Sequence, residues 1–162
     1  MKYNKSILIQ KLIEHEGLVL QVYQDTLGID TIGIGRNLED RGLSDNELEE
    51  MGITLDHVYE FGITEADAIL LAENDVEIVE DELLRAHPCV DGLDAVRQLV
   101  LIDMAFNMGV PRLCKFKKMW AAIHNEDFTV ASKEMLDSRW SNQVKSRSTK
   151  LAHAMYSGEM SG

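Results

Sequence analysis

The sequence predicts an α+β fold with a short antiparallel sheet near the N terminus, a long connecting helix and a helical C-terminal lobe. Three observations predict it. Residues 18–35 are rich in β-branched side chains and glycines, as in short strands joined by tight turns. Residues 64–86 carry apolar side chains at helical spacing, and the chain after them repeats that spacing in shorter segments. Strands confined to one early segment, with helices elsewhere, define the α+β class.

The first expected element is a helix over residues 6–16, and the sheet follows at residues 18–35. Tyr23 and several β-branched residues favour strands there, and glycines supply the turns. Gly33 and Gly35 alternate with two isoleucines. They mark either a strand face without side chains, open to a ligand or another backbone, or a bulge or tight corner of the sheet.

The next two helices carry their own start signals. Ser44 and Glu47 fit a capping box that opens a short helix, which stops at Gly52. Thr64 can cap a long helix that runs to about Ala86. At roughly 1.5 Å per residue this helix is over about 30 Å long, enough to bridge two lobes.

The C-terminal half of the chain is expected to be helical throughout. Residues 92–108 are apolar nearly all round a helix, which is typical of a central buried helix. Gly109 and Pro111 end it. Two or three shorter helices are expected around residues 115–124, 127–137 and 142–156.

The composition excludes several classes of partner. The chain has 162 residues, enough for one domain or two small lobes that share a core. Its net charge of −12 opposes binding to nucleic acid and electrostatic attraction to an anionic membrane or cell-wall polymer. No apolar run approaches the roughly 18–20 residues that span a bilayer, and no signal-peptide pattern is present, so we expect folding in a cytoplasm. Cys89 and Cys114 are expected to be free thiols, and the scattered histidines predict neither a metal site nor a cofactor.

Glu16 lies at an unusual place for a carboxyl group. At about 100° per residue it falls in the middle of the apolar stripe of residues 8–13, whereas Glu14 falls on the outer face. Desolvation penalises the charged form of such a group, which favours the protonated state that a general acid needs. The alternative is that Glu16 is the frayed last residue of its helix, turned to solvent before Gly17.

Asp25 is the second carboxyl group of interest. It precedes a Thr-x-Gly segment, so ordinary turn chemistry is the alternative to a functional role. Two carboxyl groups in unlike environments suit the cleavage of a glycosidic bond. One protonates the leaving oxygen, and the other activates a water molecule or attacks the sugar.

Several segments together resemble one known family. Glu16, Asp25 and Thr31, at spacings of nine and six within "EGLVLQVYQDTLGIDTIGIG", are similar to the catalytic segment of the bacteriophage lysozymes, the endolysin muramidases. "LDAVR" and "DMAFNMG" are similar to the central helix of that family. Phe116, "SRW", Gln143 and Arg147 are similar to its C-terminal part. The resemblance covers nearly the whole chain, apart from residues 36–63 and the last few.

The resemblance implies a muramidase, which hydrolyses the β-1,4 bond between N-acetylmuramic acid and N-acetylglucosamine in peptidoglycan. Glu16 would be the general acid, and Asp25 and Thr31 would place and activate the attacking water, giving inversion. The implied substrate-binding residues are Phe106, Asn107 and Arg147. Taken alone, Arg147 is typical of a surface arginine, and Phe106 is equally typical of a core aromatic.

The resemblance also implies a domain organisation and a biological setting. Residues 1–162 would form one lysozyme domain, with sub-lobes at about 14–63 and at 1–13 plus 87–162, joined by the helix over 64–86. We expect a monomer that acts on peptidoglycan during phage-induced lysis. It would leave the host cytoplasm and reach the cell wall through a separate membrane pore.

The sequence departs from the family pattern at several positions. Arg36 stands where the family has His, Asn107 where Gln is usual, and Asp103, a candidate buried acid, where Asn is expected. Met119 and Glu134 stand where polar sugar contacts would be expected. Two other functions therefore stay open: a catalytically silent peptidoglycan-binding or structural domain, and a lytic transglycosylase that uses one acid.

Overall fold

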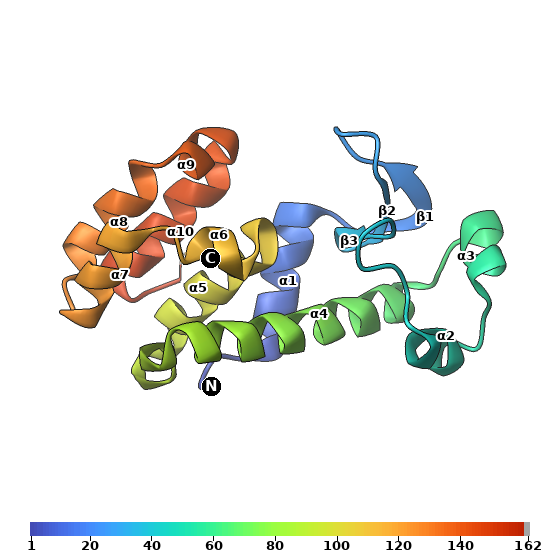
Figure 1. Ribbon diagram of the computed structural model, residues 1–162, viewed down its shortest axis with the longest axis horizontal. Coiled ribbons are helices and arrows are strands. Elements are labelled where there is room, and N and C mark those ends of the chain that lie inside the picture. Colours follow the sequence, from blue (N-terminus) through green and yellow to red (C-terminus); the bar gives the residue numbers. More distant parts are fainter. Residues whose placement is uncertain (161–162) are drawn as a thin grey trace. The chain divides into compact units, whose positions relative to one another are not determined.

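The computed structural model describes residues 1–160 and places ten α-helices, one 3₁₀ helix and a three-stranded antiparallel sheet among them (Figure 1). The predicted α+β class is therefore confirmed. The chain forms two compact units. We call residues 5–75 the sheet unit, and residues 1–4 together with 76–160 the helical unit.

The sheet unit holds the strands and the first helices. Its elements are α1 (Lys5–Glu16), β1 (Val19–Gln24), β2 (Asp30–Gly33), β3 (Arg36–Asn37), α2 (Asp45–Met51), α3 (Leu55–Phe61) and the first part of α4 (Glu65–Ala86). The strands lie in the order β1-β2-β3, and both pairs are antiparallel. The expected first helix and sheet are both present, whereas α3 lies outside the prediction.

The two glycines of "TIGIG" form a tight corner rather than a bare strand face. Gly33 and Gly35 have φ angles of 68° and 70°, in the left-handed region that favours glycine. Between them Ile34 is buried, and the chain turns from β2 into β3. A Cβ atom at Gly33 would lie 3.6 Å from the Cβ of Ala68 on α4, so the corner packs against that helix. The tight-corner alternative is therefore confirmed.

The predicted helix caps are present. Ser44 Oγ accepts a hydrogen bond from the Glu47 N–H at 3.1 Å, and the Glu47 carboxylate accepts the Ser44 N–H at 3.0 Å. Gly52 ends α2 with a φ of 69°. Thr64 Oγ1 accepts the Asp67 N–H at 3.1 Å and so caps α4. Each cap satisfies N–H or C=O groups that a helix end leaves without a partner.

A buried ion-pair network ties β3 to α2 and α4. Arg36 is 2% exposed and donates to Glu47 on α2 and to Asp75 on α4, at 2.8 and 3.0 Å. Asn74 donates to the same Glu47 carboxylate at 3.0 Å, and Arg41 pairs with Asp75. Arg36 also donates to two backbone carbonyl oxygens. The network therefore satisfies a guanidinium and two carboxylates that are withdrawn from water.

The Glu47 carboxylate makes the stability of the sheet unit depend on pH. Burial raises its pKa, but hydrogen bonds from Arg36, Asn74 and Ser44 outweigh burial and lower the pKa from 4.5 to about 2. Because the folded-state pKa is the lower one, this stabilisation is present above about pH 4.5 and is lost as the pH falls toward about 2.

We therefore expect the wild type to lose on the order of 2–3 kcal/mol more than the Glu47→Gln variant between about pH 5 and about pH 2. Urea unfolding at a series of pH values measures both free energies. The Glu47→Gln variant lacks the titrating group, so the difference between the two profiles isolates it. Parallel profiles would contradict the assignment.

The helical unit is built around one buried helix. Its elements are the rest of α4, the 3₁₀ helix η1 (Pro88–Gly92), α5 (Ala95–Met108), α6 (Val110–Leu113), α7 (Lys117–His124), α8 (Phe128–Leu136), α9 (Arg139–Gln143) and α10 (Lys145–Ser157). Leu101, Ile102 and Met104 of α5 are fully buried, which confirms the predicted central helix. Helices α6 and α10 contact α5, and α7 and α10 pack on α8 (Figure 1).

Two boundaries in the helical unit differ from the prediction. Helix α5 begins at Ala95 rather than residue 92, because Asp94 accepts the Arg97 N–H at 3.1 Å and acts as the cap. Pro111 follows the end of α5 and lies in the first turn of α6. A proline is tolerated there because the N–H groups of a first turn have no partner within the helix. None of the helices among residues 1–160 is both long and apolar enough to cross a bilayer.

Candidate active site

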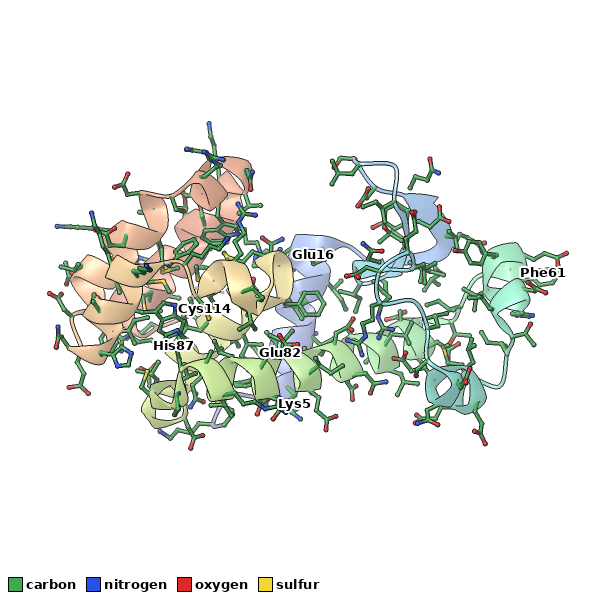
Figure 2. All side chains as sticks on the ribbon, in the orientation of Figure 1. Lys5, Glu16, Phe61, Glu82, His87 and Cys114 are labelled. Atoms are coloured by element: carbon green, nitrogen blue, oxygen red, sulfur yellow. The ribbon has the colours of Figure 1, made fainter. Side chains whose placement is uncertain are left out.

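Glu16 is the last residue of α1 and lies at its C-terminal end (Figure 2). The helix stops there because Gly17, with a φ of 84°, takes the left-handed conformation and donates to Ile13 O at 2.9 Å. Leu8 and Leu12 of the same helix are fully buried, and the side chain of Glu16 is half-buried. Glu16 is therefore the last residue of its helix, as the alternative held, but its side chain is not turned fully to solvent.

The corner between β2 and β3 approaches the Glu16 carboxylate closely. A Cβ atom at Gly35 would lie 3.2 Å from Glu16 Oε2 and 3.7 Å from the Glu16 carboxyl carbon. Only glycine combines this approach with a positive φ without strain. Gly35 therefore helps to define where the Glu16 carboxylate lies.

We expect Gly35→Ala to lower catalysis more than its effect on stability explains. The φ of 70° costs an alanine about 1 kcal/mol, and the new methyl group must push the Glu16 carboxylate aside. Gly52→Ala is the matched control, because Gly52 has a φ of 69° and nothing within 4 Å of the added Cβ. Urea unfolding and peptidoglycan hydrolysis measure the two effects. Equal activities of the two variants would contradict the role of Gly35.

Asp25 lies in the turn between β1 and β2, and its carboxylate is held on one side only. Oδ1 accepts the backbone N–H groups of Leu27 and Ile29, at 2.8 and 3.0 Å. Oδ2 makes no hydrogen bond with the residues that the structure describes. The turn-forming alternative for Asp25 is thus confirmed for one oxygen, and the same two hydrogen bonds fix the orientation of the whole carboxylate.

Thr31 is a buried residue of β2, 5% exposed. Its hydroxyl donates to Ile29 O at 2.9 Å, so its own proton is engaged and its oxygen can act only as an acceptor toward a further group. Ile29 also donates its N–H to Asp25, so one residue links the two side chains. The structure therefore brings Asp25 and Thr31 together at one end of the β1–β2 hairpin.

Tyr23 is a residue of this site that the sequence analysis did not single out. It lies directly opposite Thr31 in the β1–β2 ladder, so the two side chains share a face of the sheet. Burial raises the pKa of Tyr23, and the charges of Glu16 and Asp25 raise it further. One phenol is thus within electrostatic range of both carboxylates.

Removing either charge should therefore lower the pKa of Tyr23. We expect a downward shift in Glu16→Gln and in Asp25→Asn, measured as the titration of the labelled Tyr23 ring carbon by NMR. Glu14→Gln is the control, since Glu14 is on the exposed face of α1. An unchanged titration in both acid variants would show that the carboxylates lie on separate surfaces.

Arg147 is buried rather than exposed, so the surface-arginine alternative is wrong. It is 6% exposed, and its guanidinium pairs with the fully buried Asp103 at 2.7 and 2.8 Å. Asp103 is thus the buried acid that the sequence suggested, and its cation comes from α10. Arg97, on the same helix as Asp103, instead pairs with Asp94 at 3.0 Å.

Phe106 and Asn107 lie near the end of α5, and both are half-buried. Trp140 Nε1 donates to Asn107 Oδ1 at 2.7 Å, which fixes the orientation of that amide. Partial exposure leaves both residues able to contact a ligand. Met119, which replaces an expected polar contact, is fully buried in the helical unit and belongs to its core.

No group of three or more metal-ligating side chains is arranged to hold a metal ion among residues 1–160. Cys89 and Cys114 are free thiols. Burial raises the pKa of both thiols, which keeps them protonated and unreactive at neutral pH. The chemistry that these residues offer is therefore that of carboxyl, hydroxyl and phenol groups.

Comparison with known proteins gives consistent matches. The family model described as phage lysozyme matches residues 13–154. Probable T4-type lysozyme 1 of Dictyostelium discoideum is 30% identical over 155 residues, which cover 90% of this chain and 91% of that protein. Probable T4-type lysozyme 2 of the same organism is 29% identical over 154 residues, with the same coverage.

A further match is to part of a much longer protein. Pre-baseplate central spike protein Gp5 of Enterobacteria phage T4 is 30% identical over 162 residues, which cover 94% of this chain but 28% of that protein. The residues that the family model matches include Glu16, Asp25 and Thr31.

Proposed function

This chain belongs to the phage lysozyme family of glycoside hydrolases, as the resemblance predicted, and we propose that it cleaves the β-1,4 bond between N-acetylmuramic acid and N-acetylglucosamine in peptidoglycan. One observation carries the proposal. The half-buried carboxyl group of Glu16 and the turn-bound carboxylate of Asp25 lie close enough to Tyr23 for both charges to raise the pKa of its phenol. Two carboxyl groups in unlike surroundings are what glycosidic hydrolysis needs.

In the proposed mechanism, Glu16 donates its proton to the glycosidic oxygen as the bond from that oxygen to the sugar carbon breaks. Asp25 Oδ2 accepts a proton from a water molecule, whose oxygen bonds to the same carbon on the opposite face. Thr31 accepts the second hydrogen of that water and so orients it. Attack from the opposite face inverts the configuration, and it calls for carboxyl groups about 6.5–9.5 Å apart.

The remaining predicted contacts belong to substrate binding. Phe106 offers an apolar ring to a sugar face, and Asn107 offers an amide held by Trp140. Arg147 is locked to Asp103, so it acts through its fixed charge rather than by reaching into solvent. We propose all three as substrate-binding residues of the same reaction.

The proposed setting is phage-induced lysis of a bacterium by a monomer that reaches the wall through a separate membrane pore. The relatives allow other settings for the same chemistry. The Dictyostelium proteins match this chain over nearly their full lengths, whereas the segment of the phage spike protein that matches it is 28% of a longer chain. The hydrolytic reaction is therefore tested separately from its proposed role in phage-induced lysis.

Digestion of purified peptidoglycan tests the reaction. Hydrolysis adds one water to each released fragment, whereas a lytic transglycosylase leaves an anhydro end, and mass spectrometry separates the two. Proton NMR at early times gives the anomer: an α product from the β-linked substrate indicates inversion. Release of anhydro fragments, or of no fragments at all, would overturn the proposal in favour of the transglycosylase or the silent domain.

A further inference from the structure

Helix α3 exposes more of its large apolar side chains than it buries. Among residues 1–160, ten large apolar side chains are exposed, and three of them, Leu55, Tyr59 and Phe61, lie on this seven-residue helix. They are 45%, 46% and 61% exposed, whereas Val58 is the one buried residue of α3. A solitary exposed leucine is ordinary on a protein surface, but three apolar side chains on two turns of one helix are typical of an interaction site.

The exposure does not come from a loosely held helix. Thr54 Oγ1 accepts the His57 N–H at 3.1 Å at the start of α3, and Gly62 ends the helix with a φ of 81°. Strand β1 holds the same end, because Gln21 Nε2 donates to Phe61 O at 3.0 Å. A Cβ atom at Gly62 would overlap the backbone of β1, so only glycine lets the helix end lie this close to the strand. The apolar side chains of α3 are therefore presented on a fixed surface.

The apolar side chains of α3 lie in two rows. Leu55 and Tyr59 are four residues apart, so they share one side of the helix. His57 and Phe61 are also four residues apart, and their ring centroids are 5.0 Å apart. With the buried Val58 facing the core, a rotation of about 100° per residue places the two rows on opposite flanks of the helix. A partner that lay across α3 would meet apolar surface on both sides.

An acidic row separates the two apolar flanks. Asp56 and Glu60 fall on the side of α3 opposite Val58, and both are exposed. No cationic group among residues 1–160 lies within 4.0 Å of either carboxylate. Residues 42–84 contain fourteen carboxylates and no Lys or Arg, so no such cation comes from α2, from α3 or from most of α4. The counter-charge for this row has to come from outside the chain.

The outer surface of α3 is separate from the candidate active site. Figure 2 shows Phe61 on the outer side of α3, with the sheet between it and Glu16. Helix α3 also lies within residues 36–63, the stretch that the family resemblance leaves out. A hydrogen bond links the two regions, since the Tyr59 hydroxyl donates to Asp30 Oδ2 at 3.2 Å. Tyr59 is therefore left intact in the variants used below.

We propose that α3 docks a segment of another protein in which Lys or Arg side chains are flanked by apolar or aromatic ones. The cations would pair with Asp56 and Glu60, and the apolar side chains would cover the two flanks. Charge complementarity of this kind selects the partner, and the apolar contacts supply most of the affinity. Such a segment matches each row of α3 with the side chains that suit it.

Other occupants fit this surface less well. Nucleic acid and anionic membranes are repelled by the acidic row and by the acidic chain around it. A neutral apolar partner would cover Asp56 and Glu60 without supplying a counter-charge, which is costly. A second copy in a symmetric dimer would present the same surface and so bring two acidic rows together.

A synthetic peptide with two central lysines, flanked on each side by Trp and Leu, is the probe. Fluorescence anisotropy of the labelled peptide measures its binding to the full chain at low salt. Two control peptides have the same length: one carries Glu in place of each Lys, and the other carries Ser in place of each Trp and Leu. We expect the probe to bind saturably and about tenfold more tightly than either control peptide.

Replacing Leu55 and Phe61 together by Ser should weaken binding of the probe about tenfold, because one anchor is lost from each flank. Leu136 and Tyr156 of the helical unit form the matched control, since they are exposed to a similar extent, 47% and 56%. Replacing these two together by Ser should change the affinity by about twofold or less. Thermal unfolding checks that both double variants remain folded.

A second pair of variants tests the acidic row. Asp56→Asn combined with Glu60→Gln should weaken binding of the probe about fivefold at low salt, and less at about 1 M salt, where charges are screened within about 3 Å. Glu49→Gln combined with Glu50→Gln is the control, because both residues are exposed on α2 and the same charge is removed from the same unit. This control should change the affinity by about twofold or less.

Several outcomes would overturn the proposal. Equal losses in the α3 variants and in their controls would reduce the binding to general adhesion, and tighter binding of the Glu peptide would exclude a basic partner. Sedimentation velocity of the chain alone tests the second copy: a dimer that disappears when Leu55 and Phe61 are replaced would assign the surface to self-association instead. No measurement here uses peptidoglycan, so failure of hydrolysis would affect only the proposed function.

Discussion

Replacing Glu16 by Gln should lower the rate of peptidoglycan hydrolysis by about 10²–10⁴-fold, the range that a positioned general acid contributes. Gln has the same size and fits the same place beside Gly35, but its amide has no acidic proton to give to the leaving oxygen. The release of soluble muropeptides from purified peptidoglycan measures the rate, and thermal unfolding checks that the variant remains folded.

Glu14→Gln is the matched control for this experiment. Glu14 is on the same helix but on its exposed face, where its carboxylate is 55% exposed and lies 3.7 Å from Lys11. Such a surface pair contributes little to stability. We expect Glu14→Gln to hydrolyse peptidoglycan at close to the wild-type rate. If Glu16→Gln and Glu14→Gln had the same rate, Glu16 would not be the general acid.

Replacing Arg36 by Met should destabilise the protein by about 3–5 kcal/mol, the cost of removing one partner from a buried ion pair. Met is close in size to the Arg stem, so the loss comes from Glu47 and Asp75, which keep their charges without the guanidinium between them. Arg41 still reaches Asp75, but Glu47 keeps only two neutral donors, the amide of Asn74 and the backbone N–H of Ser44. Urea unfolding at neutral pH measures the loss.

Two comparisons make the Arg36 result specific. Arg85→Met removes an exposed ion pair with Asp81 on α4 and should cost less than about 1 kcal/mol. Adding Glu47→Gln and Asp75→Asn to Arg36→Met should recover part of the loss, because the unpaired buried charges are then gone. A loss in Arg36→Met as small as that in Arg85→Met would mean that the network contributes little to folding.

The parts of the fold that the sequence predicts well are those with signals a few residues apart. Ser44 and Glu47 identify the start of α2, Gly52 its end, and Thr64 the start of α4, because each cap is made by neighbours along the chain. Helix α3 is capped in the same way by Thr54 and Gly62, so its ends carry local signals that the prediction did not use. It is seven residues long, and Val58 is its one buried residue, so its apolar spacing is too short to recognise.

The candidate active site likewise contains residues that local sequence predicts and residues that only the folded structure places. The place of Glu16 follows from the apolar stripe of α1, and the turn around Asp25 follows from its local sequence. Tyr23 could not be placed without the strand register that sets it opposite Thr31. The pairing of Arg147 with Asp103 joins residues 44 positions apart, and no local pattern connects them.

The cation at the centre of the sheet-unit network is a guanidinium where the family resemblance led us to expect an imidazole. Burial lowers the pKa of Arg36, but its hydrogen bond to Glu47 and the charge of Asp75 outweigh burial and raise the pKa on balance. A histidine would discharge near neutrality, with an ordinary pKa of about 6.5. Arg36 stays charged at mildly alkaline pH, as in carbonate or ammonia buffers. The ion-pair network that joins β3, α2 and α4 therefore stays intact under those conditions.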